Sequence, residues 1–216
     1  MAIAPIQAYR MPQASELPAN VVDWRLDHRR SVLLVHDMQR YFAAPFPQEQ
    51  SPYTDLVANI VALRNRSAAL GVPVVYTAQP GSMTPAQRGL LADFWGPGMS
   101  GEPQQQALVD ELEQADGVVV TKWRYSAFHA SGLLDRFRSM DRDQVIICGV
   151  FAHLGCLLTA SDAFSHDIQP FFAADAVADF SRAQHDLALA HAAGSCARVS
   201  VTADLLAQLG DSGQAR

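Results

Sequence analysis

Six short, mostly apolar runs alternate along this chain with segments of helical period. The runs are residues 31–36, 72–77, 117–121, 144–149, 170–174 and 197–201. Runs of this length and composition are typical of buried strands. Strands separated by helices pair in parallel, because each helix carries the chain back to the same end of the sheet. The pattern predicts an α/β fold: a doubly wound, six-stranded parallel sheet with helices on both faces, in a three-layer, Rossmann-like arrangement.

The segments between these runs predict helices at residues 54–70, 104–114, 132–138, 154–166 and 181–193. Residues 1–30 carry scattered prolines and no sustained period, so we expect an irregular N-terminal arm with one short helix after Ser15. With 49% hydrophobic residues the chain can bury a sizeable core, and we expect a single domain over residues 1–216. Residues 210–216 are expected to form a frayed tail.

The net charge of −6 and the lack of a basic run argue against nucleic acid or an anionic membrane as a partner. An anionic small molecule remains a candidate ligand, provided that a few arginines converge. No stretch approaches the roughly 18 apolar residues of a membrane span, and residues 1–30 lack the profile of a signal peptide. We therefore expect a soluble, cytoplasmic protein.

The three cysteines are Cys148, Cys156 and Cys196. Their odd number and the absence of CxxC spacing argue against a disulfide framework and against a zinc site. The histidines are scattered over separate predicted elements without pairing at i, i+4, so we expect no metal. The glycines between residues 81 and 98 fit neither a GxGxxG nor a GxxxxGK[ST] pattern, so nucleotide binding is not supported.

Lys122 is the only lysine in a chain that carries fifteen arginines. A chain that otherwise uses arginine for its positive charges places a lone lysine where a compact ammonium is needed. Lys122 directly follows the predicted strand 117–121, and ligands of open parallel sheets bind at the carboxyl ends of the strands. The plain alternative is a surface lysine that happens to follow a strand.

Asp37 follows the first predicted strand in the same way, and residues 151–156 follow the fourth. Carboxyl ends of strands in one sheet lie side by side, so an acid, an ammonium and a helix N-terminus can share one pocket. That combination suits proton transfer to an anionic substrate. The alternative for Asp37 is a cap of the next element.

Residues 78–103 form a long segment rich in Gly and Pro that also holds Arg88, Phe94 and Trp95. Loops of this length in compact domains are usually functional or disordered. The interleaved aromatic and apolar residues favour an ordered lid.

Several segments resemble the isochorismatase family of the cysteine-hydrolase-like superfamily. They are LLVHDMQRYF (33–42), YTAQPGSMT (76–84), LLADFWGPGM (90–99), TKWRYSAF (121–128), GVFAHLGC (149–156) and VADFS (177–181). The resemblance implies a six-stranded parallel sheet, a homodimer, and no metal or organic cofactor.

The amidases of that superfamily carry a triad of aspartate, lysine and a cysteine nucleophile. In this sequence the nucleophile position falls on Gly155, and Cys156 lies one residue later. One residue along a helix is a rotation of about 100 degrees, so we expect Cys156 to point away from the pocket and to pack in the core. A glycine at position 155 resembles the vinyl-ether hydrolases of the family, and we expect it to leave room for substrate.

The resemblance implies loss of an enolpyruvyl group, as pyruvate, from isochorismate or from 2-amino-2-deoxyisochorismate, in siderophore-type or phenazine-type biosynthesis. The products would be 2,3-dihydro-2,3-dihydroxybenzoate and trans-2,3-dihydro-3-hydroxyanthranilate. A vinyl ether must first be protonated on its terminal methylene, and Asp37 is the candidate acid. Lys122 would lower the pKa of Asp37, whereas burial and the carboxylates of the substrate would raise it.

Other residues match family positions that contact the substrate. Gln79 and Arg88 match positions that hold its carboxylates, and an arginine fork suits that task. Phe42, Trp95 and Tyr125 match pocket walls, although each could be ordinary core. Phe151 departs from the tyrosine of the family motif, which removes one possible hydrogen bond, about 0.5–1.5 kcal/mol.

The two substrates are not separated by the sequence. Gly-Ser-Met at 81–83 resembles the phenazine-pathway enzymes, whereas Cys156 and the segment 158–162 resemble the siderophore type; the balance slightly favours the aminated substrate. We expect no aryl carrier domain. A Cys156-dependent amidase and a non-catalytic binding relative are the alternative functions.

Overall fold

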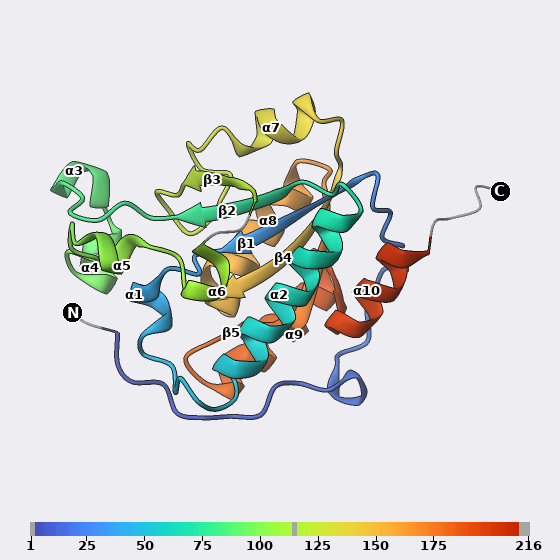
Figure 1. Cartoon of the computed structure of the whole chain (residues 1–216), viewed down its shortest axis with the longest axis horizontal. Coiled ribbons are helices and arrows are strands. Elements are labelled where there is room, and N and C mark those ends of the chain that lie inside the picture. Colours follow the sequence, from blue (N-terminus) through green and yellow to red (C-terminus); the bar gives the residue numbers. More distant parts are fainter. Residues whose placement is uncertain (1–2, 114–115, 212–216) are drawn as a thin grey trace.

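The computed structural model describes residues 3–113 and 116–211 and contains a six-stranded parallel sheet between two layers of helices (Figure 1). The strands are β1 (Ser31–His36), β2 (Val74–Ala78), β3 (Val118–Thr121), β4 (Gln144–Val150), β5 (Gln169–Ala178) and β6 (Arg198–Ser200). Their order across the sheet is β3-β2-β1-β4-β5-β6. The order reverses between β1 and β4, so the predicted doubly wound α/β fold is confirmed.

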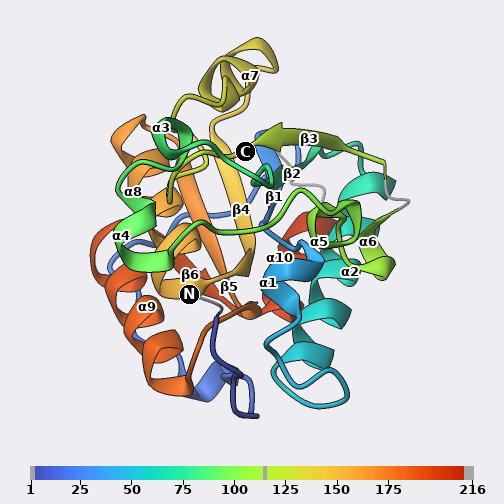
Figure 2. The ribbon, with the colours of Figure 1, turned by 90° about the vertical axis from the view of Figure 1, so that its left-hand side faces the viewer.

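Helices cover both faces of the sheet (Figure 2). The helices of the described residues are η1 (Ala14–Glu16), α1 (Arg40–Ala43), α2 (Tyr53–Ala69), α3 (Pro85–Arg88), α4 (Leu91–Trp95), α5 (Pro103–Gln106), α6 (Asp110–Glu113), α7 (Leu133–Ser139), the π-helix η2 (Ala152–Cys156), α8 (Leu157–Ser165), α9 (Arg182–Ser195) and α10 (Thr202–Gly210). The apolar side chains of α2 and α10 pack on one face, and those of α7, α8 and α9 pack on the other.

The sequence of β1 shows why both faces are covered. Leu33 and Val35 belong to the core beneath α2, whereas Val32 and Leu34 belong to the core beneath α8 and α9. Successive side chains of a strand point to opposite faces, so a strand buried on both sides is mostly apolar, as in residues 32–35 of β1. All six residues of β1 are buried, as the unbroken apolar run predicts.

Three predicted elements differ from the structure. The strand near 117–121 was expected to be buried, but β3 is an edge strand whose Val118 and Val119 are exposed, because only β2 pairs with it. The helix expected at 104–114 is divided into α5 and α6, because Leu108 forms an antiparallel bridge with Gln39 instead of continuing the helix. The segment expected as one helix at 154–166 begins as η2 and continues as α8.

The two ends of the chain also add detail. The helix α10 was not expected, and it reaches Gly210, the first residue of the predicted frayed tail. Residues 212–216 of that tail, and Gln114 of the helix predicted at 104–114, lie outside the described residues. The N-terminal arm is irregular apart from η1, as predicted, and it is packed against the body: Ile6 and Met11 are buried, and the Tyr9 hydroxyl accepts the Asp179 backbone N–H at 2.8 Å.

None of the helices described could cross a membrane, because none is both long and apolar enough.

Candidate active site

A pocket opens at the carboxyl ends of β1, β2, β3 and β4, where the strand order reverses. It is lined by Ile3, His36, Asp37, Tyr41, Phe42, Gln79, Arg88, Leu91, Trp95, Lys122, Arg124, Tyr125, Val150, Phe151, Leu154, Gly155 and Phe180. All nine residues singled out in the sequence are among them. Ligands of doubly wound sheets bind at such a switch point, so the topology explains why residues more than a hundred positions apart meet here.

Asp37 and Lys122 form a buried ion pair at the base of the pocket. The Lys122 Nζ lies 2.8 Å from Oδ2 of Asp37, and their side chains are only 2% and 5% exposed. Two further groups donate to the same carboxylate: the Thr77 hydroxyl at 2.6 Å to Oδ1 and the Gln79 amide at 3.1 Å to Oδ2. Asp37 itself has φ of 50°, in the left-handed region that aspartate tolerates better than most residues, and it does not cap α1, whose N-cap is Gln39.

The surroundings of Asp37 favour its ionised form. Burial raises the pKa of this carboxyl, but the Lys122 ammonium and the hydrogen bonds from Lys122 and Thr77 outweigh burial, so the pKa lies below its ordinary value. Donors directed at a carboxylate stabilise its charge. In the absence of a ligand, Asp37 is therefore an acceptor and carries no proton to give.

Arg88 reaches the pocket from the lid segment, at the end of α3. Its Nε donates to the Gly96 carbonyl at 3.0 Å, and its Nη1 lies 3.4 Å from Oε1 of Gln79. The guanidinium also packs on Gly98: a Cβ built on Gly98 would lie only 2.8 Å from Cζ of Arg88. Burial lowers the pKa of Arg88 below its usual value. The lid thus holds the guanidinium in place by backbone contacts.

Arg124 is a second guanidinium at the pocket, and the sequence reasoning did not single it out. It lies in the TKWRY stretch, two residues after Lys122, and its Nη1 donates to the Gln87 carbonyl at 2.8 Å. Within residues 3–113 and 116–211 no carboxylate lies within 4.0 Å of Arg88 or Arg124. The signal that the sequence offered for Arg124 was its position two residues after the lone lysine. With Lys122 already paired, two unneutralised positive charges face the pocket.

Aromatic rings form the opposite wall. Phe151 lies 4.1 Å from Phe180 between ring centroids, and Phe42 meets Phe151 edge-on at 6.3 Å. The Trp95 indole N–H donates to the Tyr125 hydroxyl at 2.7 Å, which joins the lid to the segment after β3. The wall is apolar in its body and polar at this junction, as suits a ring-shaped ligand with charged substituents.

Gln39 anchors the lid and was also missed by the sequence reasoning. Its amide donates to the carbonyls of Gln79 and Gln106 at 3.0 and 2.9 Å, and its Oε1 accepts the Gln79 N–H at 2.8 Å. Its amide also lies 3.9 Å from the Met99 sulfur. A buried glutamine of this kind has no signature in the sequence, because its partners are chosen by the tertiary fold. It fixes the start of the lid beside Asp37.

Cys156 is fully buried among apolar side chains and does not line the pocket, in agreement with its predicted packing role. Burial raises its pKa far above the ordinary thiol value. Gly155 does line the pocket, but the room expected beside it is not open. The His36 ring fills that space: a Cβ on Gly155 would lie 2.1 Å from Cε1 of His36. The space in which a side chain at position 155 would lie is thus taken by His36, while the role of Gly155 in substrate binding stays a prediction.

In the part of the chain that the structure describes, no three His, Cys, Asp or Glu side chains are grouped so that they could hold a metal ion.

The fold is a doubly wound α/β sheet with a buried carboxylate–ammonium pair at its switch point. The sequence model of the isochorismatase domain matches residues 31–204. The phenazine biosynthesis protein PhzD1 of Pseudomonas aeruginosa is 54% identical over 94% of this chain and 98% of its own length. The isochorismatase of Bacillus subtilis is 53% identical over 97% of this chain and 67% of its own length.

A cysteine hydrolase from Pseudomonas syringae shares the fold, with a TM-score of 0.79 over 88% of this chain and 96% of its own, at 24% identity. Residues 31–204, which the isochorismatase domain model matches, include all six strands and every predicted site residue. The chain belongs to the isochorismatase family, and it is a hydrolase.

Proposed function

We propose that the protein is a vinyl-ether hydrolase that releases pyruvate from 2-amino-2-deoxyisochorismate or isochorismate. The observation that carries the proposal is the charge arrangement of the pocket: a paired Asp37–Lys122 at its base and two unneutralised guanidinium groups, Arg88 and Arg124, at its rim. Isochorismate-type substrates carry one carboxylate on a six-membered ring and a second on the enolpyruvyl group. The arrangement suits a dicarboxylate held against the aromatic wall.

The reaction begins with a proton. Protonation of the terminal methylene turns it into a methyl group and leaves an oxocarbenium ion. Water adds to the carbon that bears the ether oxygen and loses a proton, which gives a hemiketal. The hemiketal hydroxyl then loses its proton as the carbonyl of pyruvate forms, the bond from this carbon to the ether oxygen breaks, and that oxygen takes up a proton to become the hydroxyl group of the ring product. Asp37 is the proposed acid, since it is the one carboxyl at the base of the pocket.

Asp37 must gain its proton when the substrate binds. A substrate carboxylate brought next to Lys122 competes for the ammonium that now lowers the Asp37 pKa, and it adds a like charge nearby. Both changes raise the pKa of the carboxyl. The bound complex is therefore expected to take up one proton from solution.

The aminated substrate is our preferred one, because Gly-Ser-Met at 81–83 resembles the phenazine-pathway enzymes. Identity to the two named relatives differs by a single percentage point, 54% against 53%, and carries no weight in this choice. We place the reaction in phenazine-type or siderophore-type biosynthesis, as the names of the relatives suggest.

A Cys156-dependent amidase has no support in the geometry. The thiol lies in the core, its pKa is raised, and the position that lines the pocket is Gly155. A non-catalytic relative would have no need of a buried ion pair held by three donors.

We further propose a homodimer, as the family resemblance implies. Two partly exposed apolar residues of α8, Leu158 and Phe164, are available for such a contact. The cytoplasm is the proposed location, because the three cysteines are free and buried, and free thiols persist in reducing compartments. Light scattering on the purified protein gives the oligomeric mass.

The decisive experiment measures pyruvate release and kcat/KM for isochorismate and its 2-amino analogue side by side. We expect turnover of at least one substrate by protein that has been extensively chelated. The absence of turnover with both would overturn the proposed reaction. Activity that is lost on chelation and restored by a divalent ion would overturn the metal-free mechanism.

A further inference from the structure

The imidazole of His36 occupies the space into which a side chain at position 155 would extend. A Cβ built on Gly155 would lie 2.1 Å from Cε1, 2.9 Å from Nε2 and 3.0 Å from Nδ1 of His36. Side-chain carbon atoms do not approach other heavy atoms as closely as the first of these distances. Either the ring or the backbone of η2 would have to move for any residue other than glycine to fit.

The His36 ring is held where it is. Its side chain is fully buried, and its Nδ1 donates to the Val150 carbonyl at 2.9 Å, which fixes the tautomer because a carbonyl can only accept. The backbone of His36 is also fixed, because β1 pairs with β4 through its register with Gly149. Moving the ring aside would leave the Val150 carbonyl buried without this donor.

The ring stays neutral in this place. Burial lowers the pKa of His36 to about 4, so the imidazole adds no charge beside Lys122. Its Nε2 has no hydrogen-bond partner among the described residues. Burial outweighs the Val150 and Tyr125 backbones, which both favour a proton on the ring, and keeps the pKa low. The side chain therefore acts through its shape and its bond to Val150.

We infer that His36 is a specificity-determining residue: by filling the space beside Gly155 it excludes any side chain, and hence any nucleophile, from the position that faces the Asp37–Lys122 pair. The inference rests on the proposed function for its chemical meaning, since a site without a nucleophile must work by proton transfer. His36 Nδ1 lies 3.9 Å from Oδ2 of Asp37, so ring and ion pair are neighbours.

The alternative outcome at this site is chemically clear. A thiol introduced at position 155 would sit near an ammonium, and cationic neighbours lower thiol pKa values and raise the fraction of reactive thiolate. The ion pair could thus serve either covalent or acid catalysis. Gly155 alone does not decide between covalent and acid catalysis, because His36 takes the space that a nucleophile would need.

The first experiment is a double-mutant cycle on thermal stability with Gly155→Ala, His36→Ala and the double variant. Overpacking lowers Tm by about 2–12 °C in a protein of this size, so Gly155→Ala should lose at least part of that range. Its matched control is Gly194→Ala in α9, where a Cβ would meet nothing within 4 Å. The control should keep or raise Tm, because alanine is the better helix former.

In the double variant the clash is gone, so its Tm loss should be clearly smaller than the sum of the two single losses. Additive losses, or an unchanged Tm for Gly155→Ala, would overturn the inference. His36→Val is made in parallel, so that the cycle can still be closed if the smaller substitution does not fold.

The second experiment reads out the chemistry that simple packing would not change. We expect His36→Ala/Gly155→Cys to gain one thiol that iodoacetamide alkylates in the folded protein, compared with His36→Ala/Gly155→Ala. The native cysteines give little background because all three are buried. Gly155→Cys alone should gain no such thiol or should fail to fold. A fast-reacting, stably folded Gly155→Cys variant would refute the role of His36.

Pyruvate release by the wild-type protein is measured separately. If that assay fails while the cycle is non-additive and the thiol appears only in the double variant, the proposed reaction is wrong and the role of His36 stands. If pyruvate is released while the two variants with Cys at position 155 react alike, the opposite holds.

Discussion

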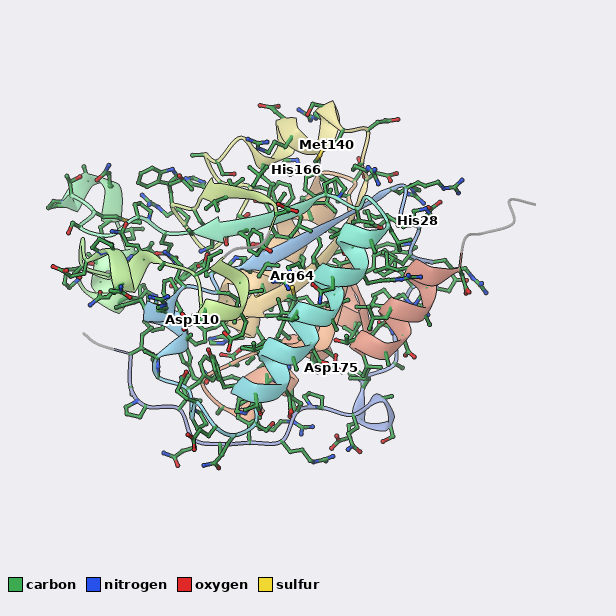
Figure 3. The ribbon with its side chains drawn as sticks, in the orientation of Figure 1. His28, Arg64, Asp110, Met140, His166 and Asp175 are labelled. Atoms are coloured by element: carbon green, nitrogen blue, oxygen red, sulfur yellow. The ribbon has the colours of Figure 1, made fainter. Side chains whose placement is uncertain are left out.

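Three groups donate to the Asp37 carboxylate at once. Its proposed catalytic role can be tested by a substitution that keeps the shape of the side chain. Asp37→Asn keeps the size and most of the hydrogen bonding but removes the transferable proton, so binding should survive while kcat falls by about 10²–10⁴-fold. The matched control is Asp175→Asn. Asp175 (Figure 3) does not line the pocket, and its carboxylate accepts the Thr202 backbone N–H, which an amide oxygen can also do. Steady-state kinetics distinguish the two, and an Asp37→Asn enzyme with more than about a tenth of wild-type kcat would assign the proton elsewhere.

The low pKa of Asp37 in the unliganded site gives a pH dependence with a definite sign. Above its pKa, the protonated fraction falls about tenfold per pH unit, and kcat/KM reports the free enzyme. We therefore expect kcat/KM to decline as pH rises through the neutral range, and this decline should vanish in Asp37→Asn. A kcat/KM that rises with pH over the same range would contradict general acid catalysis by this carboxyl.

Lys122 is a point donor at 2.8 Å from Asp37 in a space with 2% exposure. Lys122→Arg keeps the charge but replaces the ammonium with a larger planar fork. We expect both a higher KM and a lower kcat, because the fork cannot occupy the same buried position. Kinetics indistinguishable from wild type would show that charge alone suffices.

At the scale of elements, the lid from α3 to α4 presents Arg88 to the pocket. Arg88→Ala should chiefly raise KM, by about 10- to 100-fold for a lost charged hydrogen bond, because the contact is shared by ground and transition states. Arg64→Ala on α2, outside the pocket (Figure 3), is the matched control and should leave KM unchanged. An unaltered KM in Arg88→Ala would remove this residue from substrate binding.

The lid also predicts an effect from a residue that never touches the substrate. In Gly98→Ala the new Cβ would meet Arg88 Cζ at 2.8 Å and displace the guanidinium, so KM should rise towards that of Arg88→Ala. Gly71→Ala is the control: its φ of 66° brings similar backbone strain to the 80° of Gly98, but nothing lies within 4 Å of its Cβ. Equal KM values for Gly98→Ala and Gly71→Ala would show that Arg88 is not positioned by Gly98.

At the scale of the whole molecule, two buried histidines set the acid limit of stability. Burial lowers the pKa values of His36 and His185 to about 4 from 6.5. The unfolded chain therefore binds more protons between those values, and stability that is fully present above pH 6.5 is lost as pH falls towards 4. Each shift corresponds to about 3 kcal/mol.

A series of Tm values from pH 7.5 to 4 checks this expectation. His185→Gln should lower Tm at neutral pH, because His185 bonds the Ala174 carbonyl and the Tyr9 hydroxyl, yet it should shrink the fall in Tm on acidification. The difference between the two curves isolates this histidine from the carboxylates that also titrate. Parallel curves would mean that His185 keeps an ordinary pKa in the folded protein.

The sequence by itself determined the layers, the parallel sheet and the edge at which the pocket lies. Short apolar runs that alternate with helices are typical of strands in a parallel sheet that is covered on both faces, and β1 is the clearest example. Lys122 and Asp37 can also be recognised from the local sequence, because each is a charged residue that directly follows a strand. Their positions followed from topology without any knowledge of contacts.

The tertiary structure alone decided what surrounds those residues. Thr77 and Gln39 touch the site through partners far away in the chain, so nothing local in the sequence separates them from ordinary polar residues. The exposure of β3 depended on strand order, which the pattern of runs does not contain. The space beside Gly155 looked open in the sequence and is filled by His36, because β1 and β4 lie next to each other at the switch point. Volume is a property of neighbours in space, and only the folded chain brings the histidine to the glycine.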